Sequence, residues 1–212
     1  LCVVNAYNVN YPIEVYSFFK SLGAEYISFL PLVERDKCSG TSVTFESVPS
    51  KAFGQFLITI FCEWIGKDIG KVKIELFEEA FRKAFNQEHT VCVFKKECGG
   101  VPVFEHTGDL YSCDHYVTHD NLLGNINDLH ITKMLYSLKQ KEFGERKFNT
   151  LPNCCLNCEV LEMCYGECPK NRFVKLPDEQ YALNYLCAGY KSFFIHCTPF
   201  IETITAVWKS QI

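Results

Sequence analysis

Short apolar segments alternate with helical patterns along the N-terminal part of the chain. Residues 1–6 and 26–33 are apolar runs, and they predict two strands that are buried on both faces. Between them, Pro12 predicts the start of a helix that ends at Gly23. A strand, a helix and a strand at this spacing predict a βαβ unit with parallel strands.

Three further elements complete this first section. A helix from Pro49 to about Gly66 has its large apolar residues on one side, and it is followed by an expected strand over residues 72–77 and a short helix over residues 78–85. The section therefore looks like the closing βα units of a barrel. It is too short to close a barrel alone, because a complete (β/α)8 barrel takes about 200 residues or more.

The pattern changes after residue 88, where we place a boundary between two domains, residues 1–88 and 89–212. Residues 101–106 and 110–113 flank a turn that contains Gly108, and they predict a β-hairpin. The expected fold class is thus α/β in the first domain and α+β in the second.

The rest of the second domain predicts mainly helix. Asn127 or Asp128 is expected to cap a helix, after which residues 139–147 are charged and expected to face solvent. A helix that starts at Glu179 should carry Cys187, and the aromatic tail beyond it predicts further helix.

Composition narrows the class of protein. Hydrophobic residues make up 48% of the 212 residues, which is enough to bury a core, and the formal net charge of -4 offers no basic field for nucleic acid. We find no signal segment and no apolar run near the roughly 18 residues of a membrane span, so we expect a cytoplasmic protein without a membrane partner. Leu1 already lies within an apolar run, so we expect the C-terminal portion of a longer protein.

Cysteine is the most informative residue type. Five of the thirteen cysteines lie in the run from Cys154 to Cys168, and Pro169 follows at once. Thiolates held close together need a partner thiol or a metal, and in a reducing cytoplasm a cysteine cluster indicates a metal. A run that ends in Cys-x3-Cys-Pro is typical of two-cluster ferredoxins, in which the last cysteine binds the other cluster.

More thiols are available elsewhere, and together they are enough for two four-cysteine sites. The eight candidates are Cys92, Cys98, Cys113, Cys155, Cys158, Cys164, Cys168 and Cys187. A zinc site, disulfides and free core thiols are the alternatives, although only one pair has the CxxC spacing of which a zinc ribbon needs two. We expect Cys2, Cys38, Cys62, Cys154 and Cys197 to be ordinary thiols.

The spacing of the candidates resembles the seven-cysteine SPASM signature of radical S-adenosylmethionine (SAM) enzymes. Cys98 is followed after nine residues by Gly108 and after four more by Cys113, and CxxCx5Cx3C and a last cysteine come later. From LCVVNAYN to NYLCAGYKSFF the chain resembles the anaerobic sulfatase-maturating enzymes, also called arylsulfatase regulators. The likeness is carried by CGGVPVFEHTGDLYSCDH, LGNI, LPNCCLNCEV and CPKNRF.

The resemblance implies a fold and two ligand sets. The first domain would be the C-terminal end of a partial radical-SAM, TIM-like barrel, and the second a SPASM domain with two auxiliary [4Fe-4S] clusters. One cluster would be held by Cys92, Cys98, Cys113 and Cys168. The other would be held by Cys155, Cys158, Cys164 and Cys187.

The resemblance also implies a reaction. A SAM-derived radical would start the oxidation of a sulfatase cysteine or serine to Cα-formylglycine, Asp114 would act as the base, and an auxiliary cluster would accept an electron. The substrate would be an unfolded sulfatase polypeptide and the electron donor a flavodoxin or ferredoxin. The CxxxCxxC motif is absent, so SAM and a third [4Fe-4S] cluster are expected only in the full-length protein, and this chain alone is expected to be inactive.

Two other functions are open at this point. A SPASM maturase could form a crosslink in a ribosomal peptide, and a non-catalytic regulator could use the cysteines for zinc. Near the thiols, Lys170 and Arg172 could tune a cluster electrostatically or simply cover it. We expect the histidines of this region to be surface residues or hydrogen-bond donors; they are His106, His115, His119 and His130.

Overall fold

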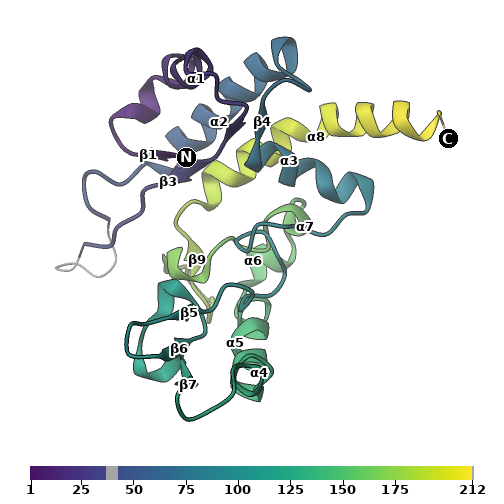
Figure 1. Ribbon diagram of the computed structural model, residues 1–212. Coiled ribbons are helices and arrows are strands. Elements are labelled where there is room, and N and C mark those ends of the chain that lie inside the picture. Colours follow the sequence, from purple (N-terminus) through teal and green to yellow (C-terminus); the bar gives the residue numbers. More distant parts are fainter. Residues whose placement is uncertain (37–42, 212) are drawn as a thin grey trace.

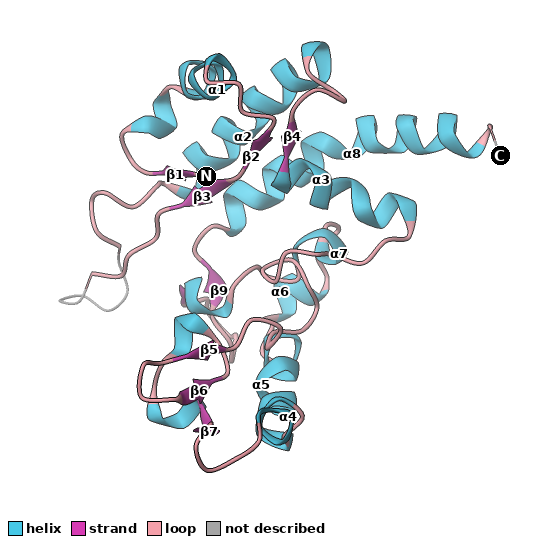
Figure 2. Ribbon diagram, in the orientation of Figure 1, coloured by secondary structure: helices cyan, strands magenta, loops and turns pink. Residues whose placement is uncertain are grey.

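Residues 1–36 and 43–211 are described by a computed structural model, which combines helices with short strands (Figures 1 and 2). The predicted thiol Cys38 lies outside the described residues. The helices are α1 (Pro12–Ser21), α2 (Ser50–Lys67), α3 (Glu75–Arg82), α4 (Ile131–Leu135), α5 (Leu138–Asn149), α6 (Asn153–Leu156), α7 (Leu161–Cys164) and α8 (Cys187–Lys209). The strands are β1 (Cys2–Val4), β2 (Tyr26–Ile27), β3 (Phe29–Pro31), β4 (Lys73–Ile74), β5 (Val103–Phe104), β6 (Asp109–Tyr111), β7 (Leu122–Asn125), β8 (Arg172–Val174) and β9 (Leu183–Asn184). Short 3₁₀ helices are η1 (Asn8–Asn10), η2 (Lys83–Phe85), η3 (Asp114–Tyr116), η4 (His119–Asn121) and η5 (Pro169–Asn171).

The elements form two parts. The helical part, residues 1–85 and 186–211, holds β1–β4, α1–α3 and α8 at the top of Figure 1. The thiol-rich part, residues 86–185, holds β5–β7, α4 and α5 at the bottom, with α6 and α7 between them and the helical part.

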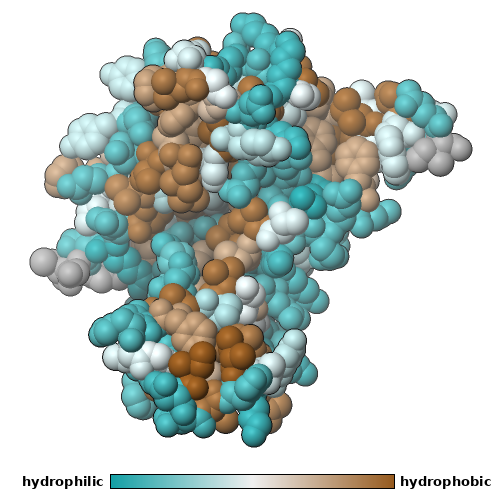
Figure 3. Space-filling model, viewed as in Figure 1, coloured by the Kyte–Doolittle hydropathy of each residue, from teal (hydrophilic) through white to brown (hydrophobic). Residues whose placement is uncertain are grey.

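The predicted parallel βαβ unit is confirmed. β1 pairs with β3 in parallel, with Cys2 opposite Phe29, and α1 connects them. The expected strand over residues 26–33 is split at Ser28, because β2 leaves β3 to pair with β4. The prediction that these strands are buried on both faces is wrong, because Val4 is fully buried whereas the neighbouring Val3 is 45% exposed. One face of this small sheet is therefore open within the described residues, and apolar side chains reach the surface of both parts in Figure 3.

The predicted strand over residues 72–77 is shortened to Lys73–Ile74 because α3 begins at Glu75. Leu76, Phe77 and Ala80 are buried at helical spacing, and acidic Glu75 and Glu78 lie in the first turn, where they favour a helix N-terminus.

Helices α2 and α8 cross closely in the helical part. A Cβ added to Gly54 would lie 2.6 Å from the carbonyl oxygen of Gly189, so each helix needs a glycine at the crossing. Aromatic rings fill the core beside it, and Phe77 stacks on Phe193 with 5.4 Å between the ring centroids. The C-terminal helix of the predicted second domain thus shares a core with the first, and the division at residue 88 stays a prediction.

The predicted hairpin is confirmed as the antiparallel pair β5 and β6, and Gly108 has the positive φ (+89°) that its turn requires. The sequence interpretation missed β7, which adds a third strand next to β6. The predicted cap is also wrong, because the side chain of His130 accepts the hydrogen bond from the Thr132 amide and caps α4.

The prediction that residues 139–147 face solvent is confirmed for one side of the helix, including Lys139, Lys141 and Arg146, and is wrong for the other. They belong to α5, a separate helix capped by Ser137, and one side of it is buried. The buried residues recur every three or four positions, as expected for one helix face, and they are Gln140, Phe143, Gly144 and Lys147.

The helix predicted from Glu179 does not exist; α8 begins at Cys187. Asn184 explains the difference, because its side-chain amide donates to the Glu167 carboxylate and its side-chain oxygen accepts from the Leu186 amide. These bonds hold β9 extended, while helix through the aromatic tail is confirmed to Lys209. Across the described stretches of the chain, no helix has both the length and the apolar character needed to span a bilayer.

Candidate functional site

Four of the predicted ligands line one pocket between the two parts of the molecule. They are Cys155, Cys158, Cys164 and Cys187. Three come from the two short helices α6 and α7 and the turn between them, and Cys187 is the first residue of α8. Val160, Leu161 and Tyr190 give the pocket an apolar wall. We call these four cysteines the pocket thiols.

Burial and mutual proximity disfavour thiolates among the pocket thiols in the absence of a cation. Burial raises the pKa of Cys155 to about 12, and the charges of the adjacent Cys154 and then of Cys187 and Cys164 add to this effect. Burial likewise raises the pKa of Cys164 to about 12. Deprotonation of the group therefore needs a positive charge in the pocket, which a metal supplies.

The backbone after Cys164 follows an unusual path. Tyr165, Gly166 and Glu167 all have positive φ, at 44°, 68° and 48°. The Glu167 amide donates to the Cys164 carbonyl at 2.9 Å, and the backbone amides of Gly166 and Glu167 act against burial by lowering the pKa of Cys164. Gly166 is required for a second reason, because a Cβ there would clash with Leu151 and lie 2.9 Å from Arg172 Nη2.

The other four predicted ligands are Cys92, Cys98, Cys113 and Cys168, and all four lie in loops outside the helices and strands. We call them the loop thiols. Burial raises the pKa of Cys98, and the charge of Cys92 adds to it. Burial also raises the pKa of Cys113 to about 11 and of Cys168 to about 12, and Cys98 contributes to both shifts. The three partners therefore lie within electrostatic reach of one sulfur, although they come from segments far apart in the sequence.

Helix α5 holds the loops that carry these thiols. The Cys98 amide donates to the Gly144 carbonyl at 3.1 Å, and a Cβ on Gly144 would lie 2.8 Å from the Cys98 carbonyl oxygen. Gln140 Nε2 donates to the carbonyl oxygens of Gly99 at 2.8 Å and Ser112 at 3.3 Å. The buried face of α5 thus fixes the backbone on both sides of the loop thiols.

Lys147 is the residue of this site that the sequence interpretation missed. Its side chain is 1% exposed, and Nζ donates to the carbonyl oxygens of Cys92 at 3.0 Å, Val93 at 2.8 Å and Lys95. Burial lowers the pKa of Lys147. The helical spacing of the buried face was a signal that could have found it.

Arg172 and Glu167 lie between the two groups of thiols. Arg172 donates to the carbonyl oxygens of Gly166 at 3.0 Å and Lys147 at 2.6 Å, which ties the pocket loop to α5. The buried carboxylate of Glu167 accepts hydrogen bonds from the side chains of Asn171 at 3.1 Å and Asn184 at 2.6 Å. Arg172 therefore has a structural role as well as a charge near both groups.

Asp114, the predicted base, directly follows Cys113 at the start of η3. Its side chain is 54% exposed, and the Cys113 thiol donates to its Oδ1 at 3.3 Å. His115 Nδ1 lies 3.8 Å from the same oxygen. The carboxylate is thus at the edge of the loop thiols and open to solvent.

The remaining described cysteines differ in exposure. Cys62 and Cys154 are exposed and Cys197 is buried, and every cysteine in the described segments is a free thiol. Cys62 Sγ lies 3.4 Å from His196 Nε2. In the same segments, no three Cys, His, Asp or Glu side chains are arranged around a single metal ion.

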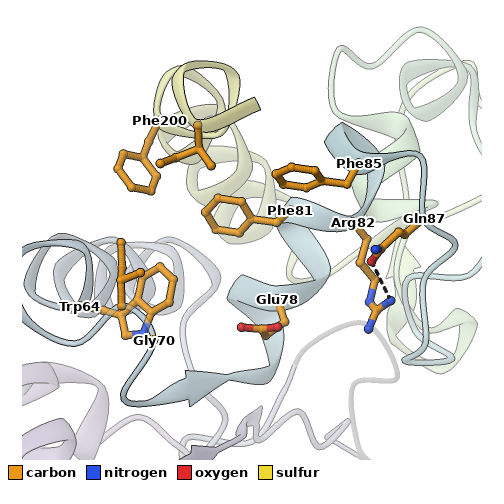
Figure 4. Close-up of a pocket in the computed structure, with 10 residues that line it drawn as sticks. Trp64, Gly70, Glu78, Phe81, Arg82, Phe85, Gln87 and Phe200 are labelled. Carbon is orange, nitrogen blue, oxygen red and sulfur yellow. Dashed lines mark hydrogen bonds between the residues drawn. The ribbon is translucent and has the colours of Figure 1, made fainter. Parts of the chain in front are cut away.

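A separate groove lies between α2, α3 and α8 (Figure 4). Trp64, Phe81, Phe85 and Phe200 line it, and Arg82 Nη1 donates to Gln87 Oε1 at 3.4 Å at its edge. None of the predicted ligands lies among the residues that line this groove.

Comparison with known proteins shows which proteins the chain is similar to. No family model matches it. A serine-type anaerobic sulfatase-maturating enzyme of Bacteroides thetaiotaomicron is 39% identical over 95% of this chain and 52% of its own length. A cysteine-type anaerobic sulfatase-maturating enzyme of Clostridium perfringens is 27% identical over 94% of this chain and 54% of its own length. Over about half of their length, the chain is similar to anaerobic sulfatase-maturating enzymes.

A solved structure supports the same relationship. The structure described as "Native anSMEcpe with bound AdoMet and Kp18Cys peptide" superimposes with a TM-score of 0.81 and 26% identity, over 97% of this chain and 56% of that one. The chain therefore spans about half the length of the sulfatase-maturating relatives that it matches.

The pocket thiols and the loop thiols fit iron–sulfur clusters in their chemistry. Each group offers four sulfurs, and clusters of the [4Fe-4S] type are held by four cysteines. The pocket thiols share one cavity with an apolar wall, and backbone amides of Gly166 and Glu167 act to lower the pKa of Cys164 against the effect of burial. Such amides and limited solvent access are features by which proteins set cluster potentials.

Proposed function

We propose that the chain is the C-terminal part of a radical SAM enzyme that oxidises a cysteine or serine of a sulfatase to Cα-formylglycine. The pocket formed by four cysteine thiols is the observation that carries this proposal. In this scheme residues 1–88 are the end of a partial TIM-like barrel, and residues 89–212 are a SPASM domain whose last helix packs back on the barrel. Similarity to sulfatase-maturating enzymes over about half of their length supports both statements.

Two sets of residues would hold the auxiliary clusters. The pocket thiols Cys155, Cys158, Cys164 and Cys187 would hold one [4Fe-4S] cluster. The loop thiols Cys92, Cys98, Cys113 and Cys168 would hold the other. When bound, such clusters supply one-electron acceptors for the oxidation. The chain's own contribution is to present eight sulfurs from fixed loops, with α5 and Arg172 connecting the two sites.

Asp114 would take the proton that the substrate thiol or hydroxyl loses. In the free protein its Oδ1 accepts from the Cys113 thiol. A Cys113 sulfur that serves as a ligand has lost its hydrogen, so the same carboxylate oxygen becomes free to accept a proton from substrate. Its exposure gives a polypeptide access from solvent.

The proposed substrate and electron donor are inferred from the proteins that the chain is similar to. A similar solved structure is described as having bound AdoMet and a peptide, which supports a polypeptide substrate, here an unfolded sulfatase. SAM and a third [4Fe-4S] cluster would be bound only by the full-length protein, since this sequence has no CxxxCxxC motif. A flavodoxin- or ferredoxin-type donor and a cytoplasmic location complete the proposal.

Adjacent cysteines provide a matched test of the site. Cys155 is buried in the pocket, whereas Cys154 is exposed and does not line it. In anaerobically prepared full-length protein, Cys155→Ala should lower the iron and sulfide content by about four each, while Cys154→Ala should leave both unchanged. Asp114→Asn should keep its iron but lose formylglycine formation in a sulfatase peptide, measured by mass spectrometry.

Three results would overturn the proposal. One or two zinc ions with no iron in the wild-type protein would indicate a zinc-binding regulator. A crosslinked peptide product in place of formylglycine would indicate a different SPASM maturase. Equal iron loss in the Cys154 and Cys155 variants would remove the ligand assignment.

A further inference from the structure

The hydrogen bonds of the buried Lys147 side chain determine its charge state. Its Nζ donates to three carbonyl oxygens, those of Cys92, Val93 and Lys95. A carbonyl oxygen can only accept, and a neutral amine has two N–H groups, whereas an ammonium has three. Three simultaneous donations therefore require the charged form of Lys147.

A buried ammonium needs a compensating negative charge. Moving a charge out of water is unfavourable unless it is paired and hydrogen-bonded. Among the described residues, no carboxylate lies within ion-pair distance of Lys147 Nζ. Buried Glu167 is close enough to interact, but its carboxylate accepts from Asn171 and Asn184 instead.

The loop thiols become negative groups near this ammonium when they bind a metal as thiolates. Cys98 and Cys168 are both within electrostatic reach of Lys147. The ammonium also holds the carbonyl of Cys92 itself, and the Gly144 carbonyl one turn earlier on α5 holds the Cys98 amide. Lys147 thus contacts the backbone of one loop thiol and supplies a positive charge beside two more.

We propose that Lys147 is a positioning residue for the cluster at the loop thiols, and that its ammonium stabilises the reduced form of that cluster. This role rests on the proposed function. A cluster bound by four thiolates gains one negative charge on reduction, so a fixed nearby cation favours the reduced state and raises the reduction potential. The second cluster, at the pocket thiols, lies outside the contacts of this side chain.

Redox titration of the full-length protein tests the proposal. The protein is reconstituted anaerobically, and the reduced-cluster signals are followed by electron paramagnetic resonance. The signal of the loop-thiol cluster is the one that disappears in Cys98→Ala. Lys147→Met removes the charge, Lys147→Arg keeps it, and Lys141→Met is the matched control, since Lys141 lies on the same helix with its side chain 71% exposed.

We expect Lys147→Met to shift the midpoint potential of that one signal to a more negative value at unchanged iron content. Lys147→Arg should restore most of the shift, and Lys141→Met should have no effect. If Lys147→Met fails to load the site, Lys147→Arg is compared with Lys147→Gln, and the charged variant should have the higher potential.

Two results would overturn the inference in different ways. Equal potentials for the charged and neutral variants, with both clusters loaded, would remove the role of Lys147 and leave the proposed function intact. Wild-type protein that binds no iron would remove both.

Discussion

The two parts of the molecule are stabilised by different interactions. In the helical part, large aromatic side chains such as Phe61, Phe77 and Phe193 are almost fully buried and pack on one another. In the thiol-rich part, many buried side chains are polar and bind backbone carbonyls, as Lys147 does. Burial of apolar area is the main stabilising interaction of the first part, whereas the second depends more on directional contacts and on what its thiols bind.

Helix α8 joins the two parts. Its first residue, Cys187, lines the thiol pocket, and its later turns pack Phe193 and Phe194 into the aromatic core. The loop thiols have no member on α8. Loss of the aromatic core should therefore affect the pocket thiols more than the loop thiols.

The largest expected effect comes from Phe61→Ala. Phe61 is 1% exposed and contacts several rings, including Phe77 and Phe193. Removal of a buried phenylalanine side chain should lower the free energy of unfolding by about 3–5 kcal/mol. In urea titrations, iron should leave the pocket thiols at a lower concentration than in wild type, with a smaller change at the loop thiols.

The matched control is Phe18→Ala, because Phe18 is 57% exposed. We expect a loss of less than about 1 kcal/mol there. Simultaneous release of iron from both sites in Phe61→Ala would contradict the division into two differently stabilised parts.

Gly166→Ala in the thiol-rich part is expected to lower the free energy of unfolding by an intermediate amount. Gly166 has a φ of 68°, and an added Cβ would meet Leu151 and Arg172. The left-handed backbone and the overpacking together should lower the free energy of unfolding by about 2–4 kcal/mol. Calorimetry or urea unfolding would measure it, and iron loss from the pocket thiols should accompany it.

Gly66→Ala is a control of opposite sign. Gly66 lies within α2, and a Cβ there would meet nothing within 4 Å. Replacement of a helical glycine by alanine should stabilise the protein by about 0.5–1 kcal/mol. If both substitutions were neutral, the backbone path after Cys164 would not be a constraint on the site.

The contrast between the helical part and the thiol-rich part also explains which features the sequence could predict. Apolar periodicity located α1, α2 and the tail of α8. Helices α2 and α8 bury one continuous face, whereas in α1 the buried residue is Tyr16. Cysteine spacing indicated all four pocket thiols, which the structure places around one cavity. In each case a local pattern corresponds directly to the observed feature.

The errors arose where long-range polar contacts decide the structure. Lys147 reads as a surface residue in a charged stretch, and only its carbonyl partners 52–55 residues earlier explain its burial. Asn184 holds Glu167 and keeps β9 out of a helix, which local propensity cannot reveal. The strand β7 was missed for a related reason, since its partner β6 defines it.

The smallest of these effects concerns the junction between the two parts, where Glu79 of α3 meets the segment that leads to the loop thiols. Its side chain is 2% exposed, and it accepts hydrogen bonds from His89 Nδ1 at 2.7 Å and from the Thr90 amide. Burial opposes ionisation, but the hydrogen bonds from His89 and Thr90 prevail and lower the pKa of Glu79 from 4.5 to about 2.

A carboxyl group whose pKa is lower in the folded protein stabilises it fully above the unfolded pKa, here about 4.5, and this contribution is lost as the pH falls towards about 2. Glu79→Gln should therefore lower the free energy of unfolding by about 1.5–3 kcal/mol at neutral pH, the size expected for a hydrogen bond to a charged group. It should also make the free energy of unfolding less dependent on pH in the acidic range. Glu88→Gln is the control, because Glu88 is 93% exposed. Urea unfolding at a series of pH values between 2 and 7 would measure both variants. If Glu79→Gln lost as much stability on acidification as wild type, the His89–Glu79 contact would not be what joins the aromatic core to the thiol-rich part.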